Sequence, residues 1–467
     1  MRIIIIAITT LLLGVIPCCN FAPKNCRPKW PIPCKWPVEL CDESLNVANM
    51  PWWQLFEDPV LNDLICEALL RNRDLAVAVA TVNEYWARLG IAEAPLFPSL
   101  RYDASALRQE ASLATTSPIP GVPRIYDIFA PEVFLSYEVD LWGTLRNARC
   151  AALHDLLSRE EAQRGVIITL VTAVARAYIQ LQALDKQLTI SEDTLKSRIY
   201  SLELATARYK EGLTSELPVK QAKADLDNAR TQKLQLEVLI PQKENELSVL
   251  IGHNPEHICL EHKLDDLRAP KIPFNLPSEV LCQRPDILQA EHNLYAANAK
   301  LGIARAAFFP SLNLNALFGF SGDNLNSLFT PATRTWAIGS SLLGSIFQGG
   351  QLWNQTHTAY WITQELVYTY QKAIQTAFKE VSDALIAHKL SISLLDAQSD
   401  QVKALEGYLR LAKLLYENGQ TGYLTVLDAE RNLFTSQLNL AEVKANVFLT
   451  IIDVYRAIGG GWDACIN

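Results

Sequence analysis

The sequence predicts a mainly α-helical chain with a small membrane β-barrel part, built from a duplicated unit of two strands followed by long helices. Three observations lead to this fold class. The second half of the chain repeats motifs of the first, and each half contains two segments of alternating polarity. Each pair of segments precedes a proline-free stretch, at residues 144–210 and 348–418. A duplication of this extent predicts a pseudo-symmetric protein, because two copies of one unit fold alike.

Three pairs of motifs carry the duplication. The members of each pair lie at nearly the same separation along the chain, so they mark two copies of one unit. The pairs are IAEAPLFPSL (91–100) with IARAAFFPSL (303–312), GTLRN (143–147) with GQLWN (350–354), and ARYKEGLTSELPVKQA (207–222) with LLYENGQTGYLTVLDA (414–429).

Composition excludes several functional classes. The chain has 467 residues, of which 49% are hydrophobic, and a formal net charge of −8. A negative balance without basic stripes argues against nucleic acid as a partner. The sequence contains no phosphate-binding glycine loop, no metalloprotease motif and no nucleophile elbow. No catalytic residue, cofactor or enzymatic activity is therefore expected.

The N-terminus predicts an exported protein. Met1-Arg2 gives a short positive start, and residues 3–16 are almost wholly apolar. Such a run is typical of a secretory signal peptide, here residues 1–18, and is short for a membrane span. No later stretch reaches eighteen consecutive apolar residues, so no transmembrane helix is expected after the signal.

Cysteine marks the end of the signal. The apolar run ends abruptly at two adjacent cysteines, which predicts a lipoprotein in which Cys19 carries the lipid. Cys18 is the alternative lipidation position, and cleavage of the signal without lipidation stays open. Residues 19–55 are rich in proline, lysine and tryptophan and predict an extended, lipid-anchored tether. An exported chain meets an oxidising compartment, so disulfide pairing is also open among Cys26, Cys34 and Cys41.

The first structural repeat is expected at residues 56–256. It begins with one helix at 58–93, capped by Asp58-Pro59. Alternating polarity then predicts two strands and a Ser/Thr/Pro/Gly loop between them, at 100–107, 133–141 and 109–130 respectively.

Long helices complete this repeat. A rod at 144–210 has apolar residues at coiled-coil intervals and ends at Gly212, since glycine supplies the left-handed turn after a helix. The return helix at 215–251 contains Pro241, which is expected to kink it.

Residues 257–277 are expected to link the two repeats, and the second repeat covers 278–467. Its first helix, 278–307, contains Arg284-Pro285-Asp286, where proline suits the first turn of a helix. The remaining elements mirror the first repeat: strands at 312–320 and 336–342, a long helix at 348–418 ended by Gly419, and a return helix at 423–458.

Residue types that bind zinc gather near the end of the first repeat. They are His253, His257, Cys259 and His262. Their spacing matches no strong metal-binding motif, and they follow a glycine that ends a helix. Surface histidines are therefore expected here, and no metal site.

The strand count predicts an oligomer. Four strands cannot close a barrel, because membrane barrels need at least eight strands. Unpaired strand edges cannot face lipid either. The chain is therefore expected to share a barrel with copies of itself. Three copies would supply twelve strands, although this argument alone does not fix the number.

These motifs resemble the TolC-type outer-membrane efflux proteins, and within them the lipid-anchored OprM/NodT branch. The resemblance covers essentially the whole chain after the tether. It rests on WWQLF (52–56), the two FPSL copies, SYEVDLWG (136–143), RPDILQAE (284–291) and the two Y-x-x-G turns. It implies a homotrimer with a 12-stranded β-barrel in the cell outer membrane and a long α-helical barrel in the periplasm.

The resemblance also implies partners and a function. The partners are a periplasmic adaptor (a membrane fusion protein) and an inner-membrane pump, commonly of the RND class. The function is a passive exit duct of a tripartite efflux system for small molecules. Two alternatives stay open: an exit duct for protein or metal export with another pump, and a periplasmic coiled-coil scaffold that never spans the membrane.

The same resemblance implies adaptor contacts at the helix tips. These positions are Tyr209 and Gly212 in the first turn, and Tyr416 and Gly419 in the second. Tight turns between helices are the simpler interpretation of the same residues.

A gate is implied near the second tip. Leu424 and Asp428 match positions of an apolar ring and an acidic ring that close the resting channel; ordinary coiled-coil packing is the alternative. An apolar ring can block flow by dewetting, and an acidic ring favours cations. Many relatives carry a basic residue just before the second tyrosine. This chain has Leu415 there, so its gating mechanism stays open.

Overall fold

The computed structural model describes residues 20–28, 30–31, 51–110, 112, 124–260, 263–270 and 284–462. Cys18, Cys19, Cys34, Cys41 and His262 lie outside these residues, as do the signal peptide and part of the linker. The described chain forms two compact units. Unit 1 contains the described residues within 20–28, 81–159 and 289–371, and unit 2 contains those within 30–80, 160–288 and 372–462.

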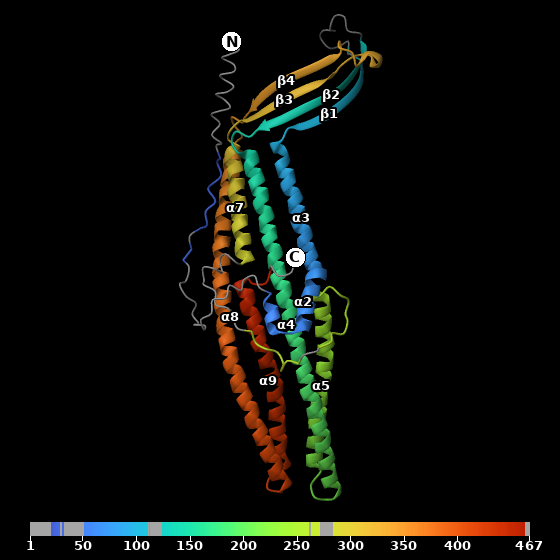
Figure 1. Ribbon diagram of the computed structural model, residues 1–467, viewed down its shortest axis with the longest axis vertical. Helices are drawn as coiled ribbons and strands as arrows, with labels where there is room; N and C mark the ends of the chain where they lie inside the picture. The colour runs from blue at the N-terminus through green and yellow to red at the C-terminus, as the bar shows by residue number, and fades with distance from the viewer. Residues whose placement is uncertain are drawn as a thin grey trace. The chain divides into compact units, whose positions relative to one another are not determined.

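The predicted duplication is confirmed in the order of the elements. Each half has a first helical segment, which is split into α2 and α3 in the first half, followed by two strands, a 67-residue helix and a return helix (Figure 1). The first half contains η1 (Trp52–Phe56), α2 (Pro59–Arg71), α3 (Arg73–Glu93), η2 (Ala94–Leu96), β1 (Ser99–Glu110), β2 (Ile125–Val139), α4 (Thr144–Lys210) and α5 (Leu217–Leu250). The second contains α7 (Pro285–Ala306), β3 (Ser311–Phe320), η3 (Leu325–Ser327), β4 (Arg334–Leu343), α8 (Gln351–Glu417) and α9 (Tyr423–Ile458).

The first predicted helix, 58–93, is wrong as a single element, because the chain breaks at Asn72. The Asn72 backbone is extended (φ −60°, ψ 134°), and its side chain bonds to α3 and to α5. Its Oδ1 accepts from the Leu75 amide (3.0 Å), and its Nδ2 donates to the Leu250 carbonyl (2.9 Å). A buried asparagine that satisfies backbone groups on two sides stabilises a break that helical periodicity alone does not reveal. The predicted Asp58 cap is confirmed, since its carboxylate accepts from the Val60 and Leu61 amides.

Four antiparallel strands form one sheet in unit 1, in the order β1-β2-β3-β4. The strands exist as predicted, but the loop at 109–130 is too long, because β1 extends to Glu110 and β2 begins at Ile125. The backbone ladder continues through this extension to the pair Glu110–Ile125, and the exposed ion pairs Arg108–Asp127 and Arg124–Glu110 lie beside it. Pro131, which lacks an N–H, interrupts the polarity pattern in β2 and hides the start of the strand.

One face of the sheet is apolar and open. Paired residues across the ladder lie on the same face, and large apolar side chains recur on one of them. Each is at least 40% exposed: Leu100, Tyr102, Val133, Leu135, Leu314, Phe318, Trp336 and Ile338. The opposite face carries Arg101, Asp103, Glu132 and Asn315. An apolar face toward lipid and a polar face toward water are typical of a membrane barrel wall.

The core of unit 2 lies around the WWQLF segment. Trp52 is fully buried and stacks on Tyr455 of α9 with ring centroids 5.3 Å apart. Of the described helices, only α4 has an 18-residue window apolar enough to cross a membrane, and 72% of that window is buried inside the protein. Its burial assigns this window to core packing, because a core helix passes the same hydropathy test.

The helix predicted at 278–307 has its start at Arg284-Pro285-Asp286, as the proline indicated, and not at residue 278. Helix α7 begins at Pro285. Arg284, 7% exposed, bonds to Asp286, Glu380 and the Ala457 carbonyl, so it also fastens the helix start inside unit 2. Pro241 lies within α5, which continues through it. The kink expected at Pro241 stays a prediction.

Candidate functional site

The two predicted tip turns have the same backbone geometry. Gly212 and Gly419 adopt left-handed conformations, with φ of 71° and 72°. In each turn the glycine amide donates to the tyrosine carbonyl three residues earlier, at 3.0 Å. The next amide donates to the carbonyl before that tyrosine, at 2.9 Å. Both long helices therefore end in the same Schellman-type cap, which only glycine adopts without strain.

The two tips pack together in unit 2, where both turns lie at the same end of the helices (Figure 1). Small side chains allow this approach: Ala205 and Ala222 come from the first repeat, and Ala412 and Ala429 come from the second. The aromatic ring of Tyr416 fits here, partly buried. These contacts join α4 and α5 to α8 and α9 in one small core.

A cation–π contact joins the two tip turns. The guanidinium of Arg208 lies 4.7 Å from the centroid of the Tyr416 ring, within cation–π range. The basic residue of the first turn therefore contacts the tyrosine of the second. Leu415 itself is 41% exposed.

Buried charges lie just behind the tips. Arg198 of α4 and Glu430 of α9 form an ion pair in which both side chains are almost fully buried. Lys413 Nζ lies 3.1 Å from Glu430 Oε1, close enough for an ion pair but without hydrogen-bond geometry. Burial, with the negative charge of Glu430 next, raises the pKa of Tyr423 to about 12. The tyrosine is therefore neutral throughout the physiological range.

A second ion pair joins α5 to α9. Arg431 donates to Asp225 Oδ1 at 2.7 Å, and the Asp225 side chain is only 4% exposed. Sequence reasoning missed Asp225, Glu430, Arg431 and Arg198. The partners lie more than 200 residues apart, so local periodicity cannot pair them. Charged residues on helix faces that are otherwise apolar were the available signal.

The predicted gate residues lie at the start of α9. Leu424 is 62% exposed in the single chain. Asp428 is also exposed and accepts from Tyr408 (3.3 Å) and Asn432 (3.1 Å). Burial and the nearby Asp428 charge raise the pKa of Tyr408. The structure thus brings Asp428 together with two hydrogen-bond donors and leaves Leu424 exposed on the single chain.

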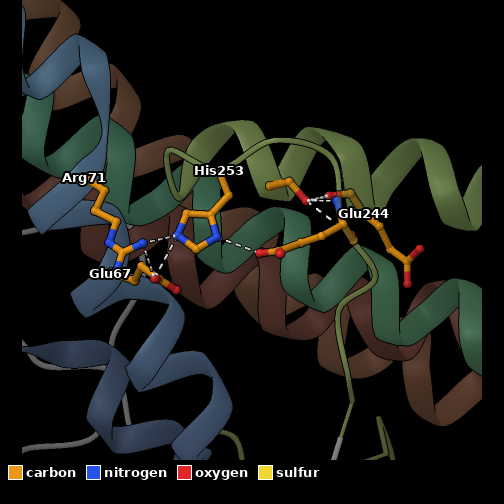
Figure 2. A network of polar contacts seen from close by, with 6 residues as sticks. Glu67, Arg71, Glu244 and His253 are labelled. Carbon is orange, nitrogen blue, oxygen red and sulfur yellow. Dashed lines mark hydrogen bonds and ion pairs between the residues drawn. The ribbon is translucent and has the colours of Figure 1, made fainter.

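The histidines after α5 make local polar contacts instead of a cluster. Figure 2 shows His253 facing Arg71 and Glu67 of α2. Its other ring nitrogen lies 2.6 Å from Glu256, and His257 lies 2.6 Å from Glu244. Nε2 of His253 lies 2.7 Å from Nη1 of Arg71 and 2.9 Å from Oε1 of Glu67. Among the described residues, no three potential metal ligands lie together.

Comparison with known proteins decides the family. The family described as "Outer membrane efflux protein" matches residues 64–253 and 276–460. The chain belongs to this outer membrane efflux protein family. A curated relative, the probable efflux pump outer membrane protein TtgC of Pseudomonas putida, is 37% identical over 466 residues, which span 98% of this chain and 95% of TtgC. The cation efflux system protein CusC of Escherichia coli is 33% identical over 451 residues (95% and 96%).

Solved structures agree with this family assignment. A crystal structure of CusC matches with a TM-score of 0.85 and 32% identity over 95% of this chain and all of that one. The open state of the Neisseria gonorrhoeae MtrE channel matches with a TM-score of 0.87 and 29% identity, over 96% and 100%. This outer membrane efflux protein is therefore an outer-membrane channel with the TolC-type fold. Members of the family work as trimeric channels within tripartite efflux pumps. The non-spanning scaffold alternative is overturned by these matches.

Proposed function

We propose that three copies of this chain form a lipid-anchored exit duct that passively releases small molecules from the periplasm. The four-stranded sheet carries this proposal. Strands β1 and β4 end the sheet of the single chain, and the apolar face beside them is open. Lipid cannot satisfy a strand edge, so each edge needs another strand. Twelve strands from three chains close such a barrel.

The tips carry the proposed gate and the proposed adaptor contact. Leu424 forms an apolar ring and Asp428 an acidic ring around the threefold axis. The paired turns, with Tyr209, Gly212, Tyr416 and Gly419, present the surface for a periplasmic adaptor. Arg208, stacked on Tyr416, acts in place of a basic residue at position 415. Gating thus rests on packing, cation–π contact and the Asp225–Arg431 pair.

The anchor and partners follow the same proposal. Cys19, with Cys18 as the alternative, carries the lipid, and residues 19–55 connect it to the first repeat at 56–256. Residues 257–277 link this to the second repeat at 278–467. The inner-membrane partner is a pump of the RND class, joined through an adaptor.

The pump sets the cargo in this proposal. Similar chains are named for different cargos: toluene for one Pseudomonas putida protein, antibiotics for another and cations for CusC. One duct architecture therefore serves several chemistries, which supports passive export. Metal or protein export with another pump stays the alternative.

Leu424→Ala tests the gate. Shortening an apolar ring widens and wets a closed constriction, so single-channel conductance in planar bilayers should rise severalfold. The purified oligomer should have the mass of three chains. Leu390→Ala, an equally exposed leucine of α8 away from the tips, is the matched control and should conduct like the unmodified channel. Unchanged conductance in Leu424→Ala removes Leu424 from the gate, and a monomer without conductance rejects the duct.

A further inference from the structure

Residues 20–28 of the tether make specific contacts in unit 1, directly after Cys19, the proposed lipidation position. Phe21 stacks on Phe309 with ring centroids 4.7 Å apart. Ala22 lies where a side chain at Gly302 would stand, since a Cβ there would come within 2.7 Å of the alanine. Arg27 donates to Glu291 of α7 at 2.8 Å. Residues 20–28 thus pack specifically against unit 1, and a flexible linker would not make these contacts.

Two stacked histidines lie beneath this segment. His154 of α4 and His292 of α7 have ring centroids 5.4 Å apart, and their Nδ1 atoms are separated by 3.3 Å. The other nitrogen of His154, Nε2, lies 3.5 Å from the amide nitrogen of Asn25 in the tether. The three side chains form one polar chain from the tether to α7.

This chain of contacts fits neutral imidazoles. The Asn25 oxygen accepts from Asn298, so the Asn25 amide nitrogen points to His154 and needs a lone pair on Nε2. His154 then carries its proton on Nδ1 and donates it to Nδ1 of His292. A proton added to His154 removes the acceptor for Asn25. A proton added to His292 removes the acceptor for His154, and two imidazolium rings repel each other.

We propose that the His154–His292 pair is a proton-sensitive clasp that holds the N-terminal tether at neutral pH and releases it in acid. The clasp is a device for adjusting how the lipid anchor connects to the channel body. It does not rest on the gate or on the cargo, because none of its residues lies at the tips.

The sign of the pH dependence follows from the surroundings. Burial, followed by the charge of His292, lowers the pKa of His154, while Asp155 and Glu291 oppose this. Glu291 is engaged by Arg27 and Tyr295, and Asp155 pairs with Lys300 at 2.9 Å. Burial and the hydrogen bond to Glu291 raise the pKa of Tyr295, and Tyr370 of α8 adds to this rise. A histidine whose docked-state pKa is lowered favours docking above its free pKa of about 6.5, and this contribution is lost as the pH falls.

Electron paramagnetic resonance of a nitroxide on Cys26 tests the clasp. Cys26 is exposed within the tether, so the label reports tether motion without blocking the histidines. The full-length lipidated protein is used in lipid nanodiscs, with the other unlipidated cysteines replaced by serine. Between about pH 7.5 and about pH 5, the ratio of mobile to immobile label should rise. This ratio can change by at most about tenfold per pH unit for each histidine that titrates.

Two variants keep the test decisive. The double variant His154→Gln with His292→Gln cannot titrate, so its spectrum should not change with pH, whether its tether is docked or free. His253→Gln, in unit 2, should retain the full response of the unmodified protein. A label equally immobile at both pH values in the unmodified protein overturns the proposal. A pH response that persists in the double variant also overturns it.

Discussion

At the residue scale, the glycines that end the two rods show what local chemistry makes predictable. A helix that stops needs a left-handed residue, and the repeated Y-x-x-G pattern marks that place twice. The structure gives both glycines nearly equal φ angles. Asn72 shows the opposite case. In the sequence it resembles a surface residue of a helix. In the fold its side chain caps α3 and also bonds to the Leu250 carbonyl of α5, 178 residues away.

Gly419→Ala should destabilise the tip. Nothing lies within 4 Å of a Cβ at this position, so the cost comes from the backbone, where the left-handed conformation costs an L-residue roughly 1–2 kcal/mol. The apparent Tm from circular dichroism should fall. Gly407→Ala is the matched control, because Gly407 lies inside helix α8 with equal space around it. It should raise the Tm, since alanine is favoured over glycine in a helix by about 1 kcal/mol. Equal shifts in both variants would contradict this account.

At the scale of elements, the repeat order, the long helices and the four strands were predictable because they depend on periodicity within one segment. Strand ends were less predictable, since the backbone ladder between β1 and β2 continues into a region of turn-forming residues. The candidate site divides in the same way. The turns were found from sequence, whereas the pairs Arg198–Glu430 and Asp225–Arg431 depend on helices that meet only in the folded chain.

Arg431→Gln should loosen the joint between α5 and α9. It leaves the buried Asp225 carboxylate without its charged partner, a loss of roughly 1–3 kcal/mol. The apparent Tm should fall, and channel conductance should rise because the tips separate more easily. Adding Asp225→Asn should recover part of the loss, since the unpaired charge is then gone.

The control for this pair is Lys403→Gln. Its ion pair with Asp400 is exposed on both sides, and such pairs contribute little. It should leave both the Tm and the conductance unchanged. An Arg431→Gln channel indistinguishable from this control would show that the α5–α9 pair does not restrain the tips.

At the scale of the whole molecule, a single chain has too few strands to close the membrane barrel. The sequence predicted shared barrel closure because four alternating segments cannot satisfy their own edges. It could not fix three as the number of chains, since edge pairing alone permits any ring with enough strands. That number comes from the family, whose solved members match almost the full chain. The sequence does not indicate the cargo at this scale either, because relatives with the same architecture are named for toluene, antibiotics and cations.

Ile338→Arg tests the assembled barrel. Ile338 is 79% exposed on the apolar face of β4 and faces lipid in the closed barrel. A charge there costs roughly 2–4 kcal/mol at the bilayer midplane, and three chains place three such charges in one wall. The yield of heat-resistant trimer in outer-membrane fractions should therefore fall sharply. Ala337→Arg is the matched control, since the neighbouring residue points to the opposite, water-facing side, and its trimer yield should stay close to normal. If Ala337→Arg were the variant that failed to assemble, the two faces of the sheet would have to be exchanged, and with them the assignment of lipid and lumen.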